Sequence, residues 1–309
     1  KRSLPWRKKV SFQKKQYFTL VSEFMLQQTQ VATVIPFFNR FINNLSSLIK
    51  LANVEEKKLI KLWEGLGYYS RAKNLKKTAQ LIVRDFNGKI PKNYDKLKSL
   101  PGIGDYTASA IMAIAFNQPF IPLDGNIERV LKRYLYLKKD REIQKDNLLK
   151  KKSVLGISSR SSDYAQALME LGALICKPSN PICDQCPISK NCKSYKKKDF
   201  TLTKIVKKNK DKYFILKVYK KNQRYLLIKN TKFNFLKNLS IFPMIELSNP
   251  KNFNENLNFK MSNMNMNIKI QYSKDYQKIP LSYWMDKKKL NSYMLPSFTK
   301  KVVQYLDKN

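Results

Sequence analysis

The chain has no histidine among its 309 residues, and acidic side chains are scarce, with 22 Asp and Glu against 61 Lys and Arg. The lack of histidine excludes mixed Cys/His metal ligation. The resulting net charge of +39 favours a polyanionic partner such as nucleic acid. Lys and Asn are enriched throughout the chain, however, and a compositional drift of the coding sequence would produce the same pattern. Charge alone therefore favours nucleic-acid binding without establishing it.

Long apolar runs are also missing. No stretch of about 18 consecutive apolar residues occurs, which argues against a membrane span, and no apolar signal segment stands at the start. We therefore expect a soluble, cytoplasmic protein that makes no membrane contact. A chain of this length has room for two domains with cores of their own.

Helical periodicity dominates residues 16–175, with helices predicted at 71–86, 105–116, 125–137 and 163–175. The Lys-rich residues 193–212 predict a linker. Runs of β-type residues at 214–219 and 225–228 then predict a hairpin joined through 220–224, and a last helix is predicted at 297–306. The predicted fold is a mainly α part followed by a smaller α+β domain over 213–309.

A glycine-containing turn and one carboxylate stand out in the helical part. Gly102 and Gly104 flank Ile103 just before a helix-competent run, a pattern that turns backbone N–H groups toward a bound phosphate. Asp124 follows at the start of the next predicted helix, within Leu-Asp-Gly-Asn. A phosphate grip beside one placed acid indicates chemistry on a nucleic acid. Asp124 could also serve only as the N-cap of its helix, and the two roles are compatible because a cap fixes the direction of the carboxylate.

All four cysteines fall in one short C-x6-C-x2-C-x5-C segment: Cys176, Cys183, Cys186 and Cys192. Two disulfides are a poor interpretation for an intracellular basic protein. Zinc prefers two closely spaced pairs, and this segment contains only one. Four thiolates in a compact loop could equally hold an iron–sulfur cluster, which the spacing favours.

Together these motifs resemble the helix-hairpin-helix DNA glycosylases that carry a [4Fe-4S] cluster, and most of all the adenine DNA glycosylases of the MutY type. The matching blocks are 4–7, 22–30, 65–69, 100–104, 123–126 and the cysteine segment. The resemblance implies removal of adenine mispaired with 8-oxoguanine or guanine in double-stranded DNA, and we expect a monomer. It implies a helical glycosylase domain over 1–192, with a six-helix unit at 16–124 and an iron–sulfur unit formed by 1–15 and 125–192.

The resemblance also implies roles for single residues. Glu23 would protonate the flipped adenine, Asp124 would stabilise the positively charged sugar, and Tyr106 and Asn126 would orient this centre. Helical spacing alone places Glu23 opposite the apolar face of its helix, which indicates a solvated side chain, but the surrounding block 22–30 reverses that interpretation in favour of the general acid. Tyr106 stands where the endonuclease III branch carries a nucleophilic Lys, so the resemblance implies a monofunctional enzyme.

Further matches concern DNA and base contacts. Gln28 and Tyr68 match residues that wedge into the duplex, and 102–104 match the phosphate grip. Lys177 and Lys190 are candidate phosphate contacts beside the cysteines, which would hold the loop 177–182 against DNA. The adenine-pocket positions are Arg2, Leu4, Trp6, Arg7, Gln166 and Met169. About four more residues separate Trp6 from Glu23 than in the family pattern.

The C-terminal domain resembles the Nudix-related recognition domain of this family, which inspects 8-oxoguanine. Where relatives carry a Phe-Ser-His run and a second His, this chain has residues 261–266, in which Ser262 remains but both imidazoles are Asn. We expect weaker discrimination of 8-oxoguanine from guanine, with the chemistry retained. Two alternatives stay open: an endonuclease III-like glycosylase with lyase activity, and a DNA-binding protein without catalysis.

Overall fold

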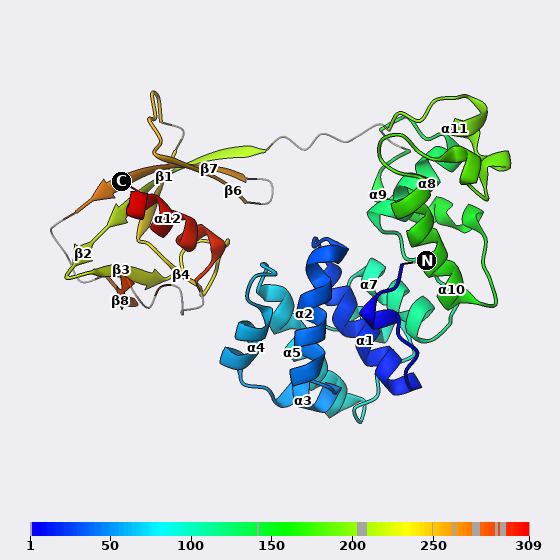
Figure 1. The fold of residues 1–309 in the computed structure, drawn as a ribbon, viewed down its shortest axis with the longest axis horizontal. Coiled ribbons are helices and arrows are strands. Elements are labelled where there is room, and N and C mark those ends of the chain that lie inside the picture. The colour runs from blue at the N-terminus through cyan, green and yellow to red at the C-terminus, as the bar shows by residue number, and fades with distance from the viewer. Residues whose placement is uncertain are drawn as a thin grey trace. The chain divides into compact units, whose positions relative to one another are not determined.

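The computed structural model describes residues 2–140, 142–202, 209–248, 250–261, 264–273, 279–287, 290 and 295–308. The chain divides into two compact units, Lys1–Ile205 and Val206–Asn309, each treated by itself below. The first unit is helical and the second is built on strands (Figure 1). The predicted mainly α part followed by a smaller α+β part is thus confirmed. Within the described residues, no helix has both the length and the apolarity needed to cross a bilayer.

The helical unit starts with a short 3-10 turn, η1 (Pro5–Arg7). Its helices are α1 (Phe12–Leu26), α2 (Val31–Asn44), α3 (Leu48–Asn53), α4 (Glu56–Trp63), α5 (Ser70–Asp85), α6 (Tyr94–Lys98), α7 (Asp105–Ala110), α8 (Gly125–Leu135), α9 (Lys145–Lys151), α10 (Ser161–Glu170) and α11 (Lys193–Lys196). Helices α7 and α10 continue in π-helical turns at Ile111–Ala115 and Leu171–Ile175. The four helices predicted between 71 and 175 correspond to α5, α7, α8 and α10.

Helix α1 runs through the core of this unit. Its residues from Gln16 to Met25 are almost all buried, because apolar side chains lie on every side of the helix and not along one stripe. It packs against α2, α5, α7 and the π turn that follows α7. The solvated position that helical spacing alone indicates for Glu23 is therefore wrong, since this side chain is only 3% exposed.

Helices α6 and α7 form a hairpin around the turn at 99–104. Gly102 has a φ of +78°, and a Cβ at this position would meet Phe24 Cε1 at 2.8 Å and Asn74 Cβ at 2.9 Å. Glycine is required here both for the backbone conformation and for space. The Thr78 hydroxyl donates to the Pro101 carbonyl at 2.8 Å and fastens the turn to α5.

The second unit contains two four-stranded sheets, ordered β5-β1-β7-β6 and β2-β3-β4 with β8 paired to β3. The strands are β1 (Lys210–Val218), β2 (Lys220–Lys221), β3 (Arg224–Lys229), β4 (Ser240–Ile241), β5 (Met244–Leu247), β6 (Leu257–Met261), β7 (Met264–Tyr272) and β8 (Ser282–Asp286). Helix α12 (Ser297–Lys308) contributes Phe298, Val302 and Leu306 to a core shared with Phe214 and Leu216 of β1. The last predicted helix corresponds to α12.

The predicted hairpin at 214–228 is wrong over most of its length. Strand β1 pairs in parallel with β7 and antiparallel with β5, whereas β3 belongs to the other sheet. Only Tyr219 and the short β2 turn back onto β3, through Asn222 and Gln223. Phe214, Leu216 and Val218 are buried at the centre of a sheet, and such burial outweighs pairing with the nearest strand in sequence.

The structure also differs from the predicted linker at both of its ends. Residues 193–196 form α11, which packs against α8, and Arg133 Nε donates to the carbonyl oxygen of Phe200 at 3.1 Å. At the other end, Lys210 already begins β1. The Lys-rich composition concealed this packing because several of the contacts use backbone carbonyl groups, which composition does not reveal.

Candidate active site

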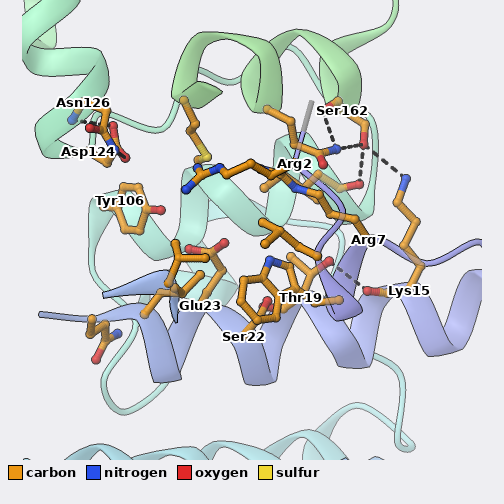
Figure 2. A pocket seen from close by; sticks show the side chains of 18 of the residues that line it. Arg2, Arg7, Lys15, Thr19, Ser22, Glu23, Tyr106, Asp124, Asn126 and Ser162 are labelled. Atoms are coloured by element: carbon orange, nitrogen blue, oxygen red, sulfur yellow. Dashed lines mark hydrogen bonds between the residues drawn. The ribbon is translucent and has the colours of Figure 1, made fainter. Parts of the chain in front are cut away.

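A cavity of about 640 Å³ lies where the N-terminal segment, α1, α7, α8 and α10 meet (Figure 2). This volume falls in the usual range for small-molecule sites. Its lining includes the predicted Arg2, Leu4, Trp6, Arg7, Glu23, Gln28, Tyr106, Asp124, Asn126, Gln166 and Met169. Tyr68 and residues 102–104 do not line this cavity, and Ser262 lies outside the described residues.

Glu23 is the buried acid of the cavity. Burial raises the pKa of Glu23 to about 7; the Tyr106 hydroxyl opposes this rise, the charge of Asp124 adds to it, and the charge of Arg7 opposes it. Its Oε2 atom is buried without a hydrogen-bond partner among the described residues. An unpaired buried carboxyl is costly for a fold to keep, and it leaves one oxygen available to a ligand.

Tyr106 lies between Glu23 and Asp124 in the close-up of the cavity (Figure 2). It stands in the first turn of α7, directly after the hairpin. Burial, and then the charges of Glu23 and Asp124, raise the pKa of Tyr106 well above its ordinary value. The side chain is therefore a protonated phenol, able to donate a hydrogen bond to a neighbouring acceptor.

Asp124 is the N-cap of α8. Its Oδ1 accepts from the backbone N–H groups of Asn126 at 3.0 Å and Ile127 at 2.7 Å, and its Oδ2 accepts from Asn126 Nδ2 at 3.1 Å. Burial raises the pKa of Asp124, while these hydrogen bonds oppose the rise. The predicted cap is thus present, and it directs the carboxylate toward the cavity.

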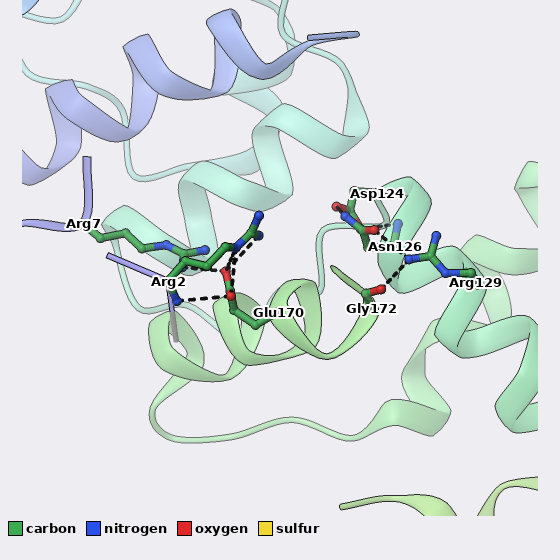
Figure 3. Close-up of polar contacts among 7 residues, drawn as sticks. All are labelled: Arg2, Arg7, Asp124, Asn126, Arg129, Glu170 and Gly172. Carbon is green, nitrogen blue, oxygen red and sulfur yellow. Dashed lines mark hydrogen bonds and ion pairs between the residues drawn. The ribbon is translucent and has the colours of Figure 1, made fainter. Parts of the chain in front are cut away.

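Arg129 connects this centre to the cysteine segment (Figure 3). One guanidinium donates to Asn126 Oδ1 at 2.8 Å, to the Gly172 carbonyl at 2.5 Å and to the Cys176 carbonyl at 2.6 Å. The start of α8 lies so close to Gly172 that a Cβ there would meet the Asn126 backbone oxygen at 2.7 Å. Sequence reasoning missed Arg129, whose i,i+3 spacing from Asn126 is the available signal.

Arg2 and Arg7 are held by a residue that sequence reasoning also missed, Glu170 (Figure 3). Arg2 Nε donates to both carboxylate oxygens at 3.1 and 3.0 Å, and Arg7 Nη1 donates to Oε1 at 2.8 Å. Burial alone would raise the pKa of Glu170, but these hydrogen bonds lower it to about 2. The contact ties the N-terminal segment across the cavity to the end of α10. The position of Glu170 one turn after Gln166 could have indicated it.

The part of the cavity lined by Lys15, Ser162 and Gln166 is polar. Lys15 Nζ donates to Ser162 Oγ at 3.2 Å, and Gln166 Nε2 donates to the Ser162 carbonyl at 2.9 Å. Because a carbonyl accepts only, this bond fixes the amide orientation of the buried Gln166. Lys15, Thr19, Ser22 and Ser162 line the cavity without having been predicted.

The four cysteines line a second, small and apolar cavity together. None of the four forms a disulfide, and burial followed by the neighbouring sulfurs raises the pKa of Cys183. Arg133 Nη1 lies 3.4 Å from Cys176 Sγ. The described residues contain no ready-made group of three or more His, Cys, Asp or Glu that could hold a single metal ion. The donor set of four thiols around one cavity fits a group bound through thiolates.

The hairpin places this molecule in a class. Residues 21–153 match the HhH-GPD family, described as "HhH-GPD superfamily base excision DNA repair protein", so the helical unit is that of a base excision DNA repair protein. An adenine DNA glycosylase of Buchnera aphidicola subsp. Baizongia pistaciae is 40% identical over 250 residues, which cover 79% of this chain and 69% of that protein. The chain belongs to the adenine DNA glycosylase family, as the resemblance predicted.

Solved structures agree with the helical fold. A thermostable thymine-DNA glycosylase is 27% identical with a TM-score of 0.54, over 63% of this chain and 89% of that one. A non-covalent endonuclease III–DNA complex is 25% identical with a TM-score of 0.51, over 59% of this chain and 85% of that one. Each of these likenesses covers no more than two thirds of this chain.

The buried Glu23 should lower the stability of the protein at neutral and alkaline pH. Its folded-state pKa of about 7 lies above the ordinary value of 4.5, so its favourable contribution is complete below about pH 4.5 and is lost as the pH rises through 7. Glu23→Gln removes this titration. From pH 4.5 to pH 8, we expect the free energy of unfolding of the variant to rise by roughly 3 kcal/mol relative to that of the parent, measured by urea unfolding. Glu55→Gln, at an exposed carboxyl, is the control; an equal gain there would contradict the prediction.

Proposed function

We propose that the protein is a monofunctional DNA glycosylase that hydrolyses the N-glycosidic bond of adenine mispaired with 8-oxoguanine or guanine in double-stranded DNA. The observation that carries the proposal is the buried, half-unpaired Glu23 close enough to Asp124 for each charge to affect the same tyrosine. Two acids in one cavity, with different surroundings, can act in different protonation states.

Glu23 would act as the general acid. With a pKa of about 7 it carries a proton in a large fraction of molecules at neutral pH, and its unpartnered Oε2 can deliver that proton to a ring nitrogen of an extruded adenine. Protonation makes adenine a better leaving group, because the base then departs without a negative charge.

Asp124 would stabilise the positive charge that develops on the sugar as the base departs. Its capping bonds favour the ionised form against burial, and they hold the carboxylate in one direction, so little reorganisation is needed during the reaction. Asn126 supports Oδ2 of this carboxylate, and Tyr106 donates a hydrogen bond to Glu23. Water then adds to the sugar and leaves an abasic site.

Tyr106 favours this function over the endonuclease III-like alternative. A phenol with a raised pKa cannot form the amine adduct on which a bifunctional lyase depends. The DNA-binding protein without catalysis is disfavoured by the cost of keeping an unpaired buried carboxyl, which binding alone would not require.

The remaining predicted residues would bind the substrate. The turn at 102–104 would grip a backbone phosphate through its N–H groups, and the exposed Gln28 and Tyr68 would enter the duplex where the adenine leaves the stack. The pocket residues Leu4, Trp6, Gln166 and Met169 would surround the base, with Arg2 and Arg7 at its edge.

Cys176, Cys183, Cys186 and Cys192 would hold a [4Fe-4S] cluster. When bound, the cluster would cross-link the segment and hold the loop 177–182, with the exposed Lys177 and Lys190, against the DNA backbone. Arg129 and Arg133 already tie this segment to α8 through the Cys176 and Lys177 carbonyls.

The second unit would be a Nudix-like domain that inspects the base opposite adenine. Its support is the mixed sheet with β1 and β7 in parallel, and a C-terminal helix in the same core. Ser262 would contact the opposing base, although it lies outside the described residues. The protein would act as a monomer in the cytoplasm.

Loss of the acid should abolish base release but spare binding. We expect Glu23→Gln to slow single-turnover adenine release by about 10²–10⁴-fold, with mispair affinity within a few-fold of the parent. The rate should fall as the pH rises through about 7, when Glu23 loses its proton, and fall again at low pH when Asp124 gains one. Retained release in the variant, or efficient borohydride trapping through a lysine, would contradict the proposal.

The identity of the base opposite adenine should affect the rate of adenine release less than it would in a protein whose recognition loop contains histidine. The chain has no histidine to donate to 8-oxoguanine. We expect adenine release opposite 8-oxoguanine and opposite guanine to differ by about tenfold or less, which corresponds to one modest hydrogen bond. Single-turnover rates on matched duplexes measure the ratio. A preference of a thousandfold would show that Ser262 and Asn263 are sufficient readers.

The metal centre can be tested by absorption. Purified protein should show a broad band near about 400 nm from thiolate-to-iron charge transfer, and Cys183→Ser should weaken it. A colourless protein with one bound zinc per chain would instead support the zinc alternative.

A further inference from the structure

Arg71, in the first turn of α5, is a buried cation, with 7% of its surface exposed. Its guanidinium donates to backbone carbonyls of two separate segments. Nη1 serves the end of α1 and the residues just after it, and Nη2 serves the loop before α5. The acceptors are Phe24 at 3.1 Å, Met25 at 2.7 Å, Gln27 at 2.5 Å, Leu66 at 3.1 Å and Gly67 at 3.1 Å.

The surroundings of Arg71 are unusual for a buried charge. The ion pairs found among the described residues do not include it. Its counter-charge is the set of carbonyl dipoles, including the negative end of the α1 dipole. The rings of Trp63 and Tyr68 lie 5.5 Å from its central carbon. A buried charge without a carboxylate is costly, which argues that the arrangement does something a neutral side chain could not.

Two of the carbonyl groups that Arg71 bonds lie directly before residues with a strained backbone. Gln28 has a φ of +57° and Tyr68 has a φ of +47°, in the left-handed region that side chains with a Cβ seldom adopt. Both side chains are exposed. The peptide carbonyls immediately before them, those of Gln27 and Gly67, are bonded by Nη1 and Nη2 of the same guanidinium. Gripping a peptide plane restricts rotation into the next residue.

We propose that Arg71 is a positioning residue that locks Gln28 and Tyr68 into one preformed pair for opening the duplex. This inference rests on the proposed function, in which these two side chains enter the helix where adenine leaves it. A preformed pair loses less conformational freedom on binding than two mobile loops. Only a planar fork reaches both carbonyls at once, because a lysine ammonium is a single point on a flexible stem.

The experiment compares Arg71→Lys in the full-length protein with Arg40→Lys as a matched control. Arg40 also donates to carbonyls of the same region, those of Leu62 and Glu64, but is exposed and bonds neither carbonyl next to the strained pair. Opening is followed by the fluorescence of 2-aminopurine beside the mispair, and release by single-turnover rates. We expect Arg71→Lys to reduce both at least tenfold on a mispaired duplex and less than threefold on an adenine opposite an abasic site, which is already unstacked. Arg40→Lys should change neither by more than twofold.

A mutant cycle that combines Arg71→Lys with the Gln28→Ala/Tyr68→Ala variant separates positioning of the pair from general support of the fold. If Arg71 acts through the pair, Arg71→Lys adds less than twofold in that background; a full tenfold loss there overturns the inference. If Arg71→Lys fails to fold, backbone order parameters of the parent decide: values near 0.85 at Gln28 and Tyr68 support a preformed pair, and values below 0.6 overturn it. Absence of adenine release by the parent would instead refute the proposed function. Duplex opening can still be measured in that case by the fluorescence of 2-aminopurine, so the two failures are distinguishable.

Discussion

A carboxyl group buried in the interior of the helical unit is the constraint on which the site depends. Glu23 is buried because α1 is enclosed on all sides, so its proton is held by burial. Asp124 lies in the same cavity, but two backbone N–H groups favour its charge. The two carboxyl groups thus have different hydrogen-bond surroundings, which hold the proton on Glu23 and favour the ionised form of Asp124. Tyr106 lies between them in Figure 2, and its raised pKa keeps the phenol neutral.

Arginine supplies much of the rigidity around this pair. Arg71, Arg129 and Arg133 each bond several backbone carbonyls near the ends of helices, where no intrahelical donor is available. Guanidinium suits this task, since it is always charged and presents donors in a fixed plane. In a chain with so few acidic residues, a large part of the basic excess is simply solvated, but these three arginines are structural.

The sequence predicted the parts of the site whose signals are local. Asp124 followed from a cap pattern before a periodic helix, and Gly102 from a Gly-Ile-Gly turn, in which the structure then leaves no space for a Cβ. Periodicity failed for Glu23, because it assumes that a helix has one buried and one exposed face. Between Gln16 and Met25, almost all of α1 is buried. The partners of Arg71 and Glu170 could not be identified, since they are backbone carbonyls or residues more than 160 positions away. The β1–β3 hairpin failed for a similar reason: β1 pairs with a strand about fifty residues further on.

Under the proposed function, helix α1 would also link extraction of the base to its chemistry. Glu23 lies inside the helix, and Gln28 stands two residues past its end. At 1.5 Å per residue, the helix places its last residue, Leu26, about 4.5 Å along the axis from Glu23. A single rigid element would therefore set the distance between the point where the stack is entered and the point where the proton is delivered. Errors in that distance are costly, because a misplacement of about 1 Å at a reacting group can lower a rate a hundredfold. Under the same proposal, the hydrogen bonds of Arg71 to the last turn of α1 would serve the chemistry as well as duplex opening.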